Sequence, residues 1–264
     1  MKRLKLVMIG NGMAGVRTLE ELLKLSDELY DITVFGAEPY ANYNRILLSP
    51  VLTGEQTLPE IMLNDVDWYA EHGITLHLGK EVVEIDRGRR IVRAADGTTA
   101  EYDRLLLATG SNPFILPVPG KDLPGVITYR DLDDVEKMLE ISERRGRAIV
   151  IGGGLLGLEA AYGLKRQGME VTVIHLMPTI MERQLDPAAA YLLEKALTER
   201  GIEIIKTYAD DGKSGLSIGG RAALQQLLTG VDRTTRVVTQ LLTLARLEPN
   251  AQPRHPQQLD LLPL

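Results

Sequence analysis

The sequence predicts an α/β protein built on two β-α-β units, each with a glycine-rich turn between its first strand and its helix. The turns are Gly10–Gly15 and Gly152–Gly157. Each follows an apolar run typical of a buried strand and opens a segment with apolar residues at helical spacing. Such a turn lets the backbone approach a pyrophosphate, to which the helix N-terminus presents unpaired N–H groups. We therefore predict two Rossmann-like dinucleotide-binding domains.

The first unit has the order strand, helix, strand. A polar, proline-punctuated segment, residues 39–73, follows it. After this segment, three short runs predict a small antiparallel or crossover β region. The first strand, helix and second strand are expected at 6–9, 14–25 and 31–35, and the short runs are 74–78, 82–85 and 90–93.

A proline-rich segment, residues 112–125, separates the two units and is the predicted crossing between them. We therefore place a first domain at residues 1–118 and a second at 119–206. The second domain is expected to hold helices at 132–144, 156–167 and 192–199 and strands at 148–151, 171–174 and 202–205.

Composition and charge narrow the possible functions. The chain has 264 residues, enough for a sizeable core, and a formal charge of -6 with basic residues dispersed among acidic ones. Nucleic acid is therefore not an expected partner. With no signal-like or membrane-spanning segment, we expect a cytoplasmic protein without membrane attachment. No metal site is expected, because the histidines lack ligand spacing.

The first turn carries the candidate contacts to a dinucleotide. The second strand leads toward Glu38, where a carboxylate could accept hydrogen bonds from an adenosine ribose. A tight turn in an unrelated Rossmann-like domain is the alternative. The candidate residues of this turn are Gly10, Gly12, Met13, Ala14 and Gly15.

Several further motifs, in this order, resemble the two-dinucleotide-binding flavoproteins. They are Tyr43–Ser49, the segment Ala108-Thr109-Gly110 after an apolar strand, the second turn extended to Ala161, and the run from His175 to Asp186. The resemblance covers residues 1–205. It is closest to the N-terminal flavoprotein part of the NAD(P)H-dependent nitrite reductase large subunit and its ferredoxin-reductase-like relatives.

The resemblance implies FAD at the first turn and NAD(P)H at the second. It places Arg45 beside the FAD pyrophosphate or flavin, where its fork suits paired phosphate contacts, although a solvated arginine is the plain alternative. It places Glu159 where flavin and nicotinamide meet, although the helix dipole favours a glutamate there anyway. The other cofactor-binding residues that it implies are Ala108, Thr109, Gly110, Gly152, Gly154, Leu155 and Gly157.

His175 stands where an acidic residue would indicate NAD. The usual rule therefore leaves NADH and NADPH open, and His175 could also simply cap its strand.

The expected activity is FAD-dependent NAD(P)H oxidation, with electrons passed to an external acceptor such as a redox protein, a metal centre or a small molecule. No side chain is expected to act as a catalytic acid or base, because the cofactors carry the chemistry. The chain has no cysteine, which excludes an internal disulfide relay and a cysteine-held iron–sulfur centre. It is therefore not expected to reduce nitrite alone.

Both dinucleotide-binding domains are expected to be incomplete after Ile205, because the late glycine-aspartate segment of the flavoproteins is missing. Beyond them we predict a linker at 207–220, an amphipathic helix at 221–248 and a tail at 249–264. The helix resembles part of the dimerisation region of sensor histidine kinases and would support a homodimer. A non-catalytic nucleotide-binding or dimerising protein is therefore the alternative reading.

Overall fold

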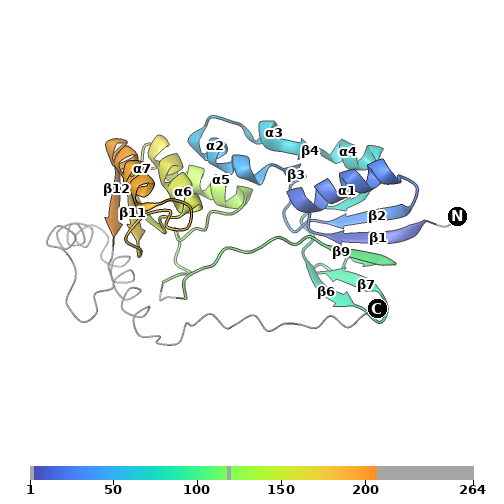
Figure 1. Cartoon of the computed structure of the whole chain (residues 1–264). Coiled ribbons are helices and arrows are strands. Elements are labelled where there is room, and N and C mark those ends of the chain that lie inside the picture. Colours follow the sequence, from blue (N-terminus) through green and yellow to red (C-terminus); the bar gives the residue numbers. More distant parts are fainter. Residues whose placement is uncertain (1–2, 118–119, 207–264) are drawn as a thin grey trace.

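The computed structural model describes residues 3–117 and 120–206 of the chain. Within that part, parallel sheets and helices form two α/β units, and an extended segment without helix or strand, residues 108–117, leads away from the first unit (Figure 1). The linker predicted at 207–220, the helix and homodimer contact predicted at 221–248, and the tail predicted at 249–264 lie outside the described residues.

The first unit is built on a parallel four-stranded sheet with the strand order β5-β2-β1-β9. Its central pair is joined by α1, which follows the first glycine turn. The bounds are β1 (Leu4–Ile9), α1 (Met13–Leu25), β2 (Tyr30–Phe35), β5 (Thr75–His77) and β9 (Arg104–Leu107).

Strand β1 is buried on both faces, because successive side chains of a strand point to opposite sides. Leu6 and Met8 pack with α1, whereas Val7 and Ile9 pack against a small antiparallel sheet. That sheet consists of β6 (Val82–Asp86), β7 (Ile91–Ala94) and β8 (Thr99–Glu101). The first sheet thus lies between a helical layer and a second β layer.

One of the three short runs after residue 73 belongs to a different sheet from the other two. The runs at 82–85 and 90–93 form the expected antiparallel pair, but the run at 74–78 contains β5, which pairs in parallel with β2. The physical reason is that β5 follows a crossover helix, α4 (Val66–Glu71), which brings it to the edge of the sheet.

The segment 39–73 is less polar in structure than its composition suggests. Its short helices bury Leu48, Leu52 and Ile61. Pro39 lies in a loop, whereas Pro50 and Pro59 stand in the first turns of α2 and α3, where they interrupt little hydrogen bonding. Besides α4, the segment holds β3 (Asn42–Tyr43), the 3-10 helix η1 (Arg45–Leu47), α2 (Leu48–Thr53), α3 (Leu58–Ile61) and β4 (Met62–Asn64).

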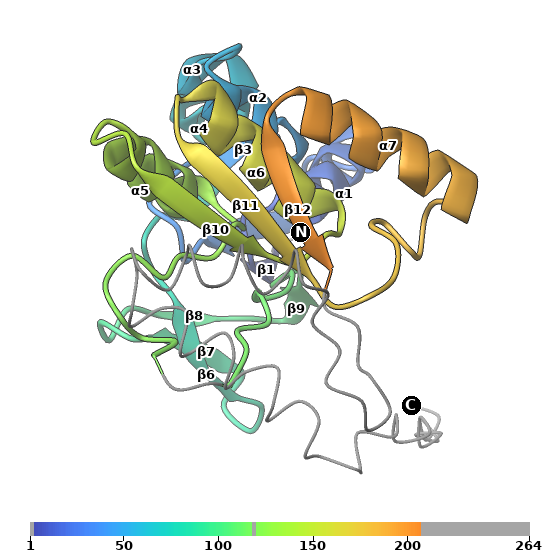
Figure 2. The same ribbon diagram turned by 90° about the vertical axis from the view of Figure 1, so that its left-hand side faces the viewer.

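The second unit has a parallel three-stranded sheet with the order β10-β11-β12 (Figure 2). The expected helices and strands are all present, with ends shifted by a few residues; the largest shift extends α7 back to Pro187. The bounds are α5 (Leu132–Ser142), β10 (Arg147–Ile151), α6 (Leu155–Arg166), β11 (Glu170–His175), α7 (Pro187–Glu199) and β12 (Ile202–Lys206).

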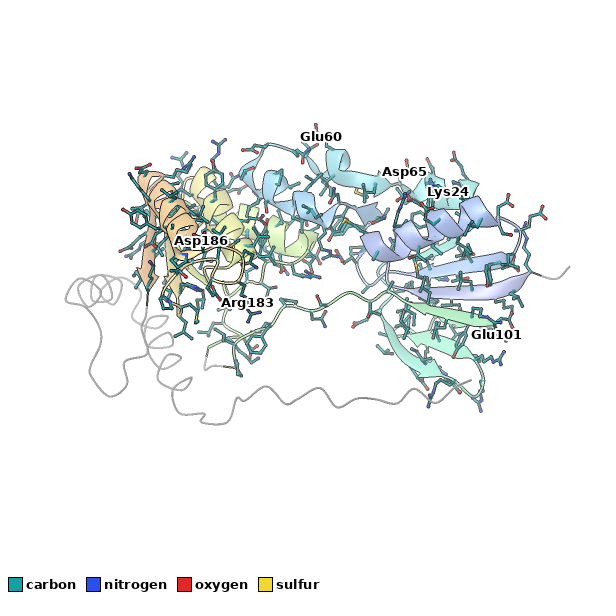
Figure 3. The ribbon with its side chains drawn as sticks, in the orientation of Figure 1. Lys24, Glu60, Asp65, Glu101, Arg183 and Asp186 are labelled. Atoms are coloured by element: carbon teal, nitrogen blue, oxygen red, sulfur yellow. The ribbon has the colours of Figure 1, made fainter. Side chains whose placement is uncertain are left out.

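Aspartates begin three of the helices. The side chains of Asp65, Asp131 and Asp186 accept hydrogen bonds from backbone N–H groups in the first turns of α4, α5 and α7. Asp65 and Asp186 are labelled in Figure 3. These caps satisfy N–H groups that have no partner within the helix.

Helix α2 belongs to the first half of the sequence but packs on the second unit. Leu52 is fully buried, and its side chain fills the space next to Gly163 of α6. The Gln167 side-chain amide donates to the Leu52 carbonyl oxygen over 2.7 Å. Figure 1 shows α2 lying beside α5 and α6. One hydrophobic core therefore includes residues from both halves of the chain.

Candidate functional site

The first glycine turn is fixed against the segment that follows β9. Gly10 has φ 107°, a conformation that side chains rarely adopt, and a Cβ there would lie 2.1 Å from the Ala108 carbonyl oxygen. Only glycine fits such a position. The turn at Gly10–Gly15 and the segment Ala108–Gly110, which the sequence predicts to share one cofactor, are therefore neighbours.

The other two glycines of this turn differ in how closely other atoms surround them. Gly12 is the N-cap of α1, and a Cβ there would meet nothing within 4 Å. A Cβ at Gly15 would come within 2.9 Å of Met8 Sδ and of Ala108 Cβ. The third glycine thus permits close packing of helix on strand, while the second leaves its backbone open to a pyrophosphate. Met13 and Ala14 supply N–H groups in the first turn of α1.

Asn11 holds the turn to the rest of the first unit. Its Oδ1 accepts a hydrogen bond from the Tyr69 hydroxyl at 2.7 Å, and its Nδ2 lies 3.4 Å from the Tyr40 carbonyl oxygen. Burial raises the pKa of Tyr69 to about 12, so this hydroxyl keeps its proton. Neither partner is predicted from the sequence, since nothing in the pattern relates Asn11 to a tyrosine 58 residues away.

Glu38 and Arg45, predicted separately as FAD contacts, form an ion pair with each other. Both side chains are half-buried, and the Glu38 carboxylate also accepts a hydrogen bond from the Tyr43 hydroxyl at 2.6 Å. The burial of Tyr43, followed by this hydrogen bond, raises the pKa of its hydroxyl. Strand β2 ends at Phe35, so Glu38 lies in the loop beyond it.

Arg45 also reaches the segment that enters the second unit. Its Nη1 donates to the Arg130 carbonyl oxygen over 2.7 Å, and Arg130 in turn donates to the Ser111 hydroxyl and carbonyl oxygens. Arg130 was missed by sequence reasoning, because its role depends on a fold that brings residues 45, 111 and 130 together. Thr109 and Gly110 lie between β9 and Ser111.

The second glycine turn repeats the geometry of the first. Gly152 has φ 119°, and Gly154, the N-cap of α6, has open space where a Cβ would stand. A Cβ at Gly157 would lie 2.1 Å from the Gly152 carbonyl oxygen. Leu155 is the first residue of α6 and is more than half exposed. Each turn therefore leads into a helix whose N-cap glycine has open space around it.

His175, the last residue of β11, lies beneath the second turn. It is buried, and its Nδ1 accepts a hydrogen bond from the Gly153 backbone N–H at 3.0 Å. Its Nε2 lies 3.0 Å from the Thr179 carbonyl oxygen and 3.2 Å from the Glu182 carboxylate. Since Nδ1 accepts, Nε2 carries the proton and donates to these oxygens. His175 thus supports the turn from below.

Glu159, on α6, lies where the two halves of the chain meet. Its carboxylate accepts a hydrogen bond from the Ser49 hydroxyl of α2 at 2.7 Å, and the same hydroxyl lies 2.9 Å from that of Tyr129. Ser49 and Tyr129 were not among the predicted site residues.

The predicted residues therefore form separate groups. The first glycine turn lies with Ala108–Gly110, Glu38 lies with Arg45, and the second turn lies with His175. Glu159 contacts α2. The two glycine turns belong to units at opposite ends of the described structure (Figure 1).

Two further properties concern metals and membranes. Among residues 3–117 and 120–206, no group of three or more histidine, aspartate or glutamate side chains is arranged to hold a metal ion. In the same part of the chain, no helix has the length and apolar character needed to cross a bilayer.

Comparison with known proteins establishes the family. Residues 4–217 match the family described as pyridine nucleotide-disulphide oxidoreductase. Two similar relatives come from Bacillus subtilis (strain 168): an assimilatory nitrate reductase electron transfer subunit, 49% identical over 205 residues, and a nitrite reductase (NAD(P)H), 50% identical over 205 residues. Each match covers 78% of this chain, and 27% and 26% of the respective relative.

A solved structure of a covalent putidaredoxin reductase–putidaredoxin complex has the same fold. The TM-score is 0.69 at 30% identity, and the match covers 78% of this chain and 50% of that chain. The chain belongs to the pyridine nucleotide-disulphide oxidoreductase family, which confirms the resemblance inferred from its motifs. It spans about a quarter of the length of the two Bacillus relatives and half of the solved chain.

Proposed function

We propose that the protein is an FAD-dependent NAD(P)H oxidoreductase that delivers electrons to an external acceptor. The observation that carries this proposal is the paired geometry of the glycine turns. Gly12 and Gly154 each cap a helix with open space over the backbone, while Gly15 and Gly157 are tightly packed. Two preformed pyrophosphate sites in one chain fit two dinucleotides between which electrons pass.

FAD is assigned to the first turn and the nicotinamide nucleotide to the second. The resemblance of the motif order to that of the two-dinucleotide-binding flavoproteins supports this assignment, as does the packing of Ala108 against Gly10 and Gly15. The first turn of α1 would hold the FAD pyrophosphate through its N–H groups. Arg45 has five N–H donors and uses only some of them on Glu38 and Arg130, so it can also donate to a phosphate.

When bound, the two cofactors would supply the redox chemistry, in which a hydride passes from nicotinamide to flavin and the electrons then pass to the acceptor. The residues of this chain bind and orient them. The N-terminus of α6 would hold the nicotinamide nucleotide, and His175 would keep Gly153 in place beneath it. Glu159 would stand near the junction of the two cofactors. No side chain need exchange a proton with substrate.

The acceptor is proposed to be external, either a redox protein, a metal centre or a small molecule. The chain contains no cysteine, so it has no disulfide of its own to receive electrons. The names of two relatives support a protein or a linked redox centre as acceptor: one is an electron transfer subunit, and one is a reductase solved in complex with putidaredoxin. The domain bounds 1–118 and 119–206 and the cytoplasmic location remain predictions.

The first experiment is to purify the chain, record its visible spectrum, and add NADH or NADPH without oxygen. A flavin spectrum that bleaches with either nucleotide is expected. A folded protein that stays colourless and takes up no added FAD would contradict the proposal and favour the non-catalytic alternative.

Two alanine variants make this test specific to each site. Gly12→Ala fills open space at the first turn and should lower FAD retention, whereas Gly154→Ala should leave FAD bound but weaken the nicotinamide nucleotide. Neither Cβ meets another atom within 4 Å, so both variants should fold normally. Equal loss of both ligands in either variant would argue against two separate dinucleotide sites.

A further inference from the structure

The hydroxyl of Ser49 joins three segments that are distant in sequence. It lies on α2, donates to Glu159 Oε2 of α6 at 2.7 Å, and lies 2.9 Å from the hydroxyl of Tyr129, just before α5. The partners are 110 and 80 residues away. All three side chains are half-buried.

The direction of these hydrogen bonds follows from the number of protons. A serine hydroxyl has one proton, and that of Ser49 is used on the Glu159 carboxylate. The Tyr129 hydroxyl must therefore donate to Ser49 Oγ. Tyr129 can do so over a wide pH range, because burial raises its pKa to about 12. The Tyr129 hydroxyl therefore donates to the Ser49 hydroxyl oxygen, and the Ser49 hydroxyl donates to the Glu159 carboxylate.

This arrangement holds one oxygen of Glu159 and leaves the other available. Among the described residues, the bond from Ser49 is the one hydrogen bond to this carboxylate. Glu159 stands two residues after Gly157, on the helix whose N-terminus forms the second glycine turn. The bond from Ser49 restricts the position of this carboxylate on the helix whose N-terminus would hold the nicotinamide nucleotide.

We infer that Ser49 and Tyr129 are positioning residues for the nicotinamide nucleotide, acting through Glu159. This inference rests on the proposed function. Side chains from outside the second β-α-β unit would then help to set the affinity of that unit for its ligand. The alternative is that these three residues stabilise the packing of α2 against α6 without affecting nucleotide binding.

The test measures the affinity of the purified chain for NADH and for FAD by titration calorimetry. Ser49→Ala should weaken NADH binding about tenfold, the order expected for losing a hydrogen bond to a charged group. Ser49→Thr, which keeps the hydroxyl, should restore affinity to within about twofold, and FAD affinity should not change in either variant. Tyr129→Phe removes a single hydroxyl and serves as a milder variant if Ser49→Ala folds poorly.

A matched control lies on the same helix. The Thr53 hydroxyl donates within α2, to the Pro50 carbonyl oxygen at 3.0 Å. Thr53→Ala should therefore leave NADH affinity unchanged. The structural alternative predicts instead that Ser49→Ala lowers the free energy of unfolding without changing NADH affinity, and that result would overturn the inference.

A double-mutant cycle tests whether Ser49 acts through Glu159. If it does, Ser49→Ala added to Glu159→Gln should cause much less loss of NADH affinity than Ser49→Ala causes alone. Full additivity would contradict the inference while leaving the oxidoreductase proposal intact. Failure of the unchanged chain to bind FAD or NADH would instead overturn the proposed function and the inference with it.

Discussion

The backbone N–H of Gly153 donates a hydrogen bond to the imidazole of His175, and the same ring fills the space where a side chain on Gly153 would stand. A Cβ there would lie 2.8 Å from His175 Cγ and 3.0 Å from Ile180 Cγ2. His175 ends β11, at the position where an acidic residue would contact the ribose of a bound NAD. In this chain the residue at that position instead supports the second glycine turn.

Gly153→Ala should destabilise the protein, because neither the buried ring nor Ile180 can move without losing contacts. We expect a loss of roughly 1–3 kcal/mol in the free energy of unfolding, as for other overpacked cores. Gly154→Ala is the neighbouring control and should change it by less than about 0.5 kcal/mol. Denaturant titration of both variants measures the difference, and equal stabilities would refute this account of the turn.

Gly163→Ala should loosen the contact between α2 and α6. The added Cβ would lie 2.5 Å from Leu52 Cγ and Cδ2, so Leu52 or a helix must shift. We expect a loss of roughly 1–3 kcal/mol for Gly163→Ala and roughly 2–5 kcal/mol for Leu52→Ala. The double variant should lose clearly less than the sum, since the smaller side chain makes room for the new Cβ. Additive losses in denaturant unfolding would show that the two residues do not compete for space.

The protein should lose stability in alkali as the pH rises from about 10 to 12. Burial raises the pKa of Tyr69 and of Tyr129 to about 12, above the value of about 10 for an exposed tyrosine. Between these pH values the folded state binds more protons than the unfolded state, so the free energy of unfolding falls as pH rises. Tyr69→Phe should make this fall shallower in denaturant titrations across the range. If the free energy of unfolding falls with pH just as steeply in Tyr69→Phe, Tyr69 does not contribute to the loss of stability in alkali.

Asp186→Ala should weaken the start of α7. The Asp186 carboxylate accepts a hydrogen bond from the Ala189 N–H at 2.8 Å, and its loss leaves that group without its cap. A decrease of about 0.5–2 kcal/mol in the free energy of unfolding is expected. Asp186→Asn, which keeps an acceptor oxygen, should retain most of the stability in the same thermal or denaturant measurement. If Asp186→Asn lowers the free energy of unfolding as much as Asp186→Ala does, the charge of Asp186, and not its hydrogen bond to the helix, is what stabilises α7.

The sequence predicts the local parts of this fold well, because they depend on short-range patterns. The alternating or continuous apolar runs identify β1, β2, β10 and β11, and the glycine turns between strand and helix follow from their spacing. Even the separate roles of Gly12 and Gly15 are those that a pyrophosphate-binding turn requires.

Long-range partners could not be predicted in the same way. The bond from Ser49 to Glu159 spans 110 residues, and the bond from Gln167 to Leu52 spans 115. Neither has a local signature, because a serine on a short helix and a glutamine at a helix end are both ordinary surface residues. The pairing of Glu38 with Arg45 was also missed, although only seven residues separate them, since each was considered only as a ligand of the cofactor.

The shared core of α2, α5 and α6 has a consequence for how the protein moves and unfolds. A segment of the first half is part of the interior of the second, so the halves cannot swing apart without exposing Leu52 and its neighbours to water. The distance between the two glycine turns is then set when the chain folds, and not when ligands bind. Heating should accordingly melt both halves in a single cooperative transition.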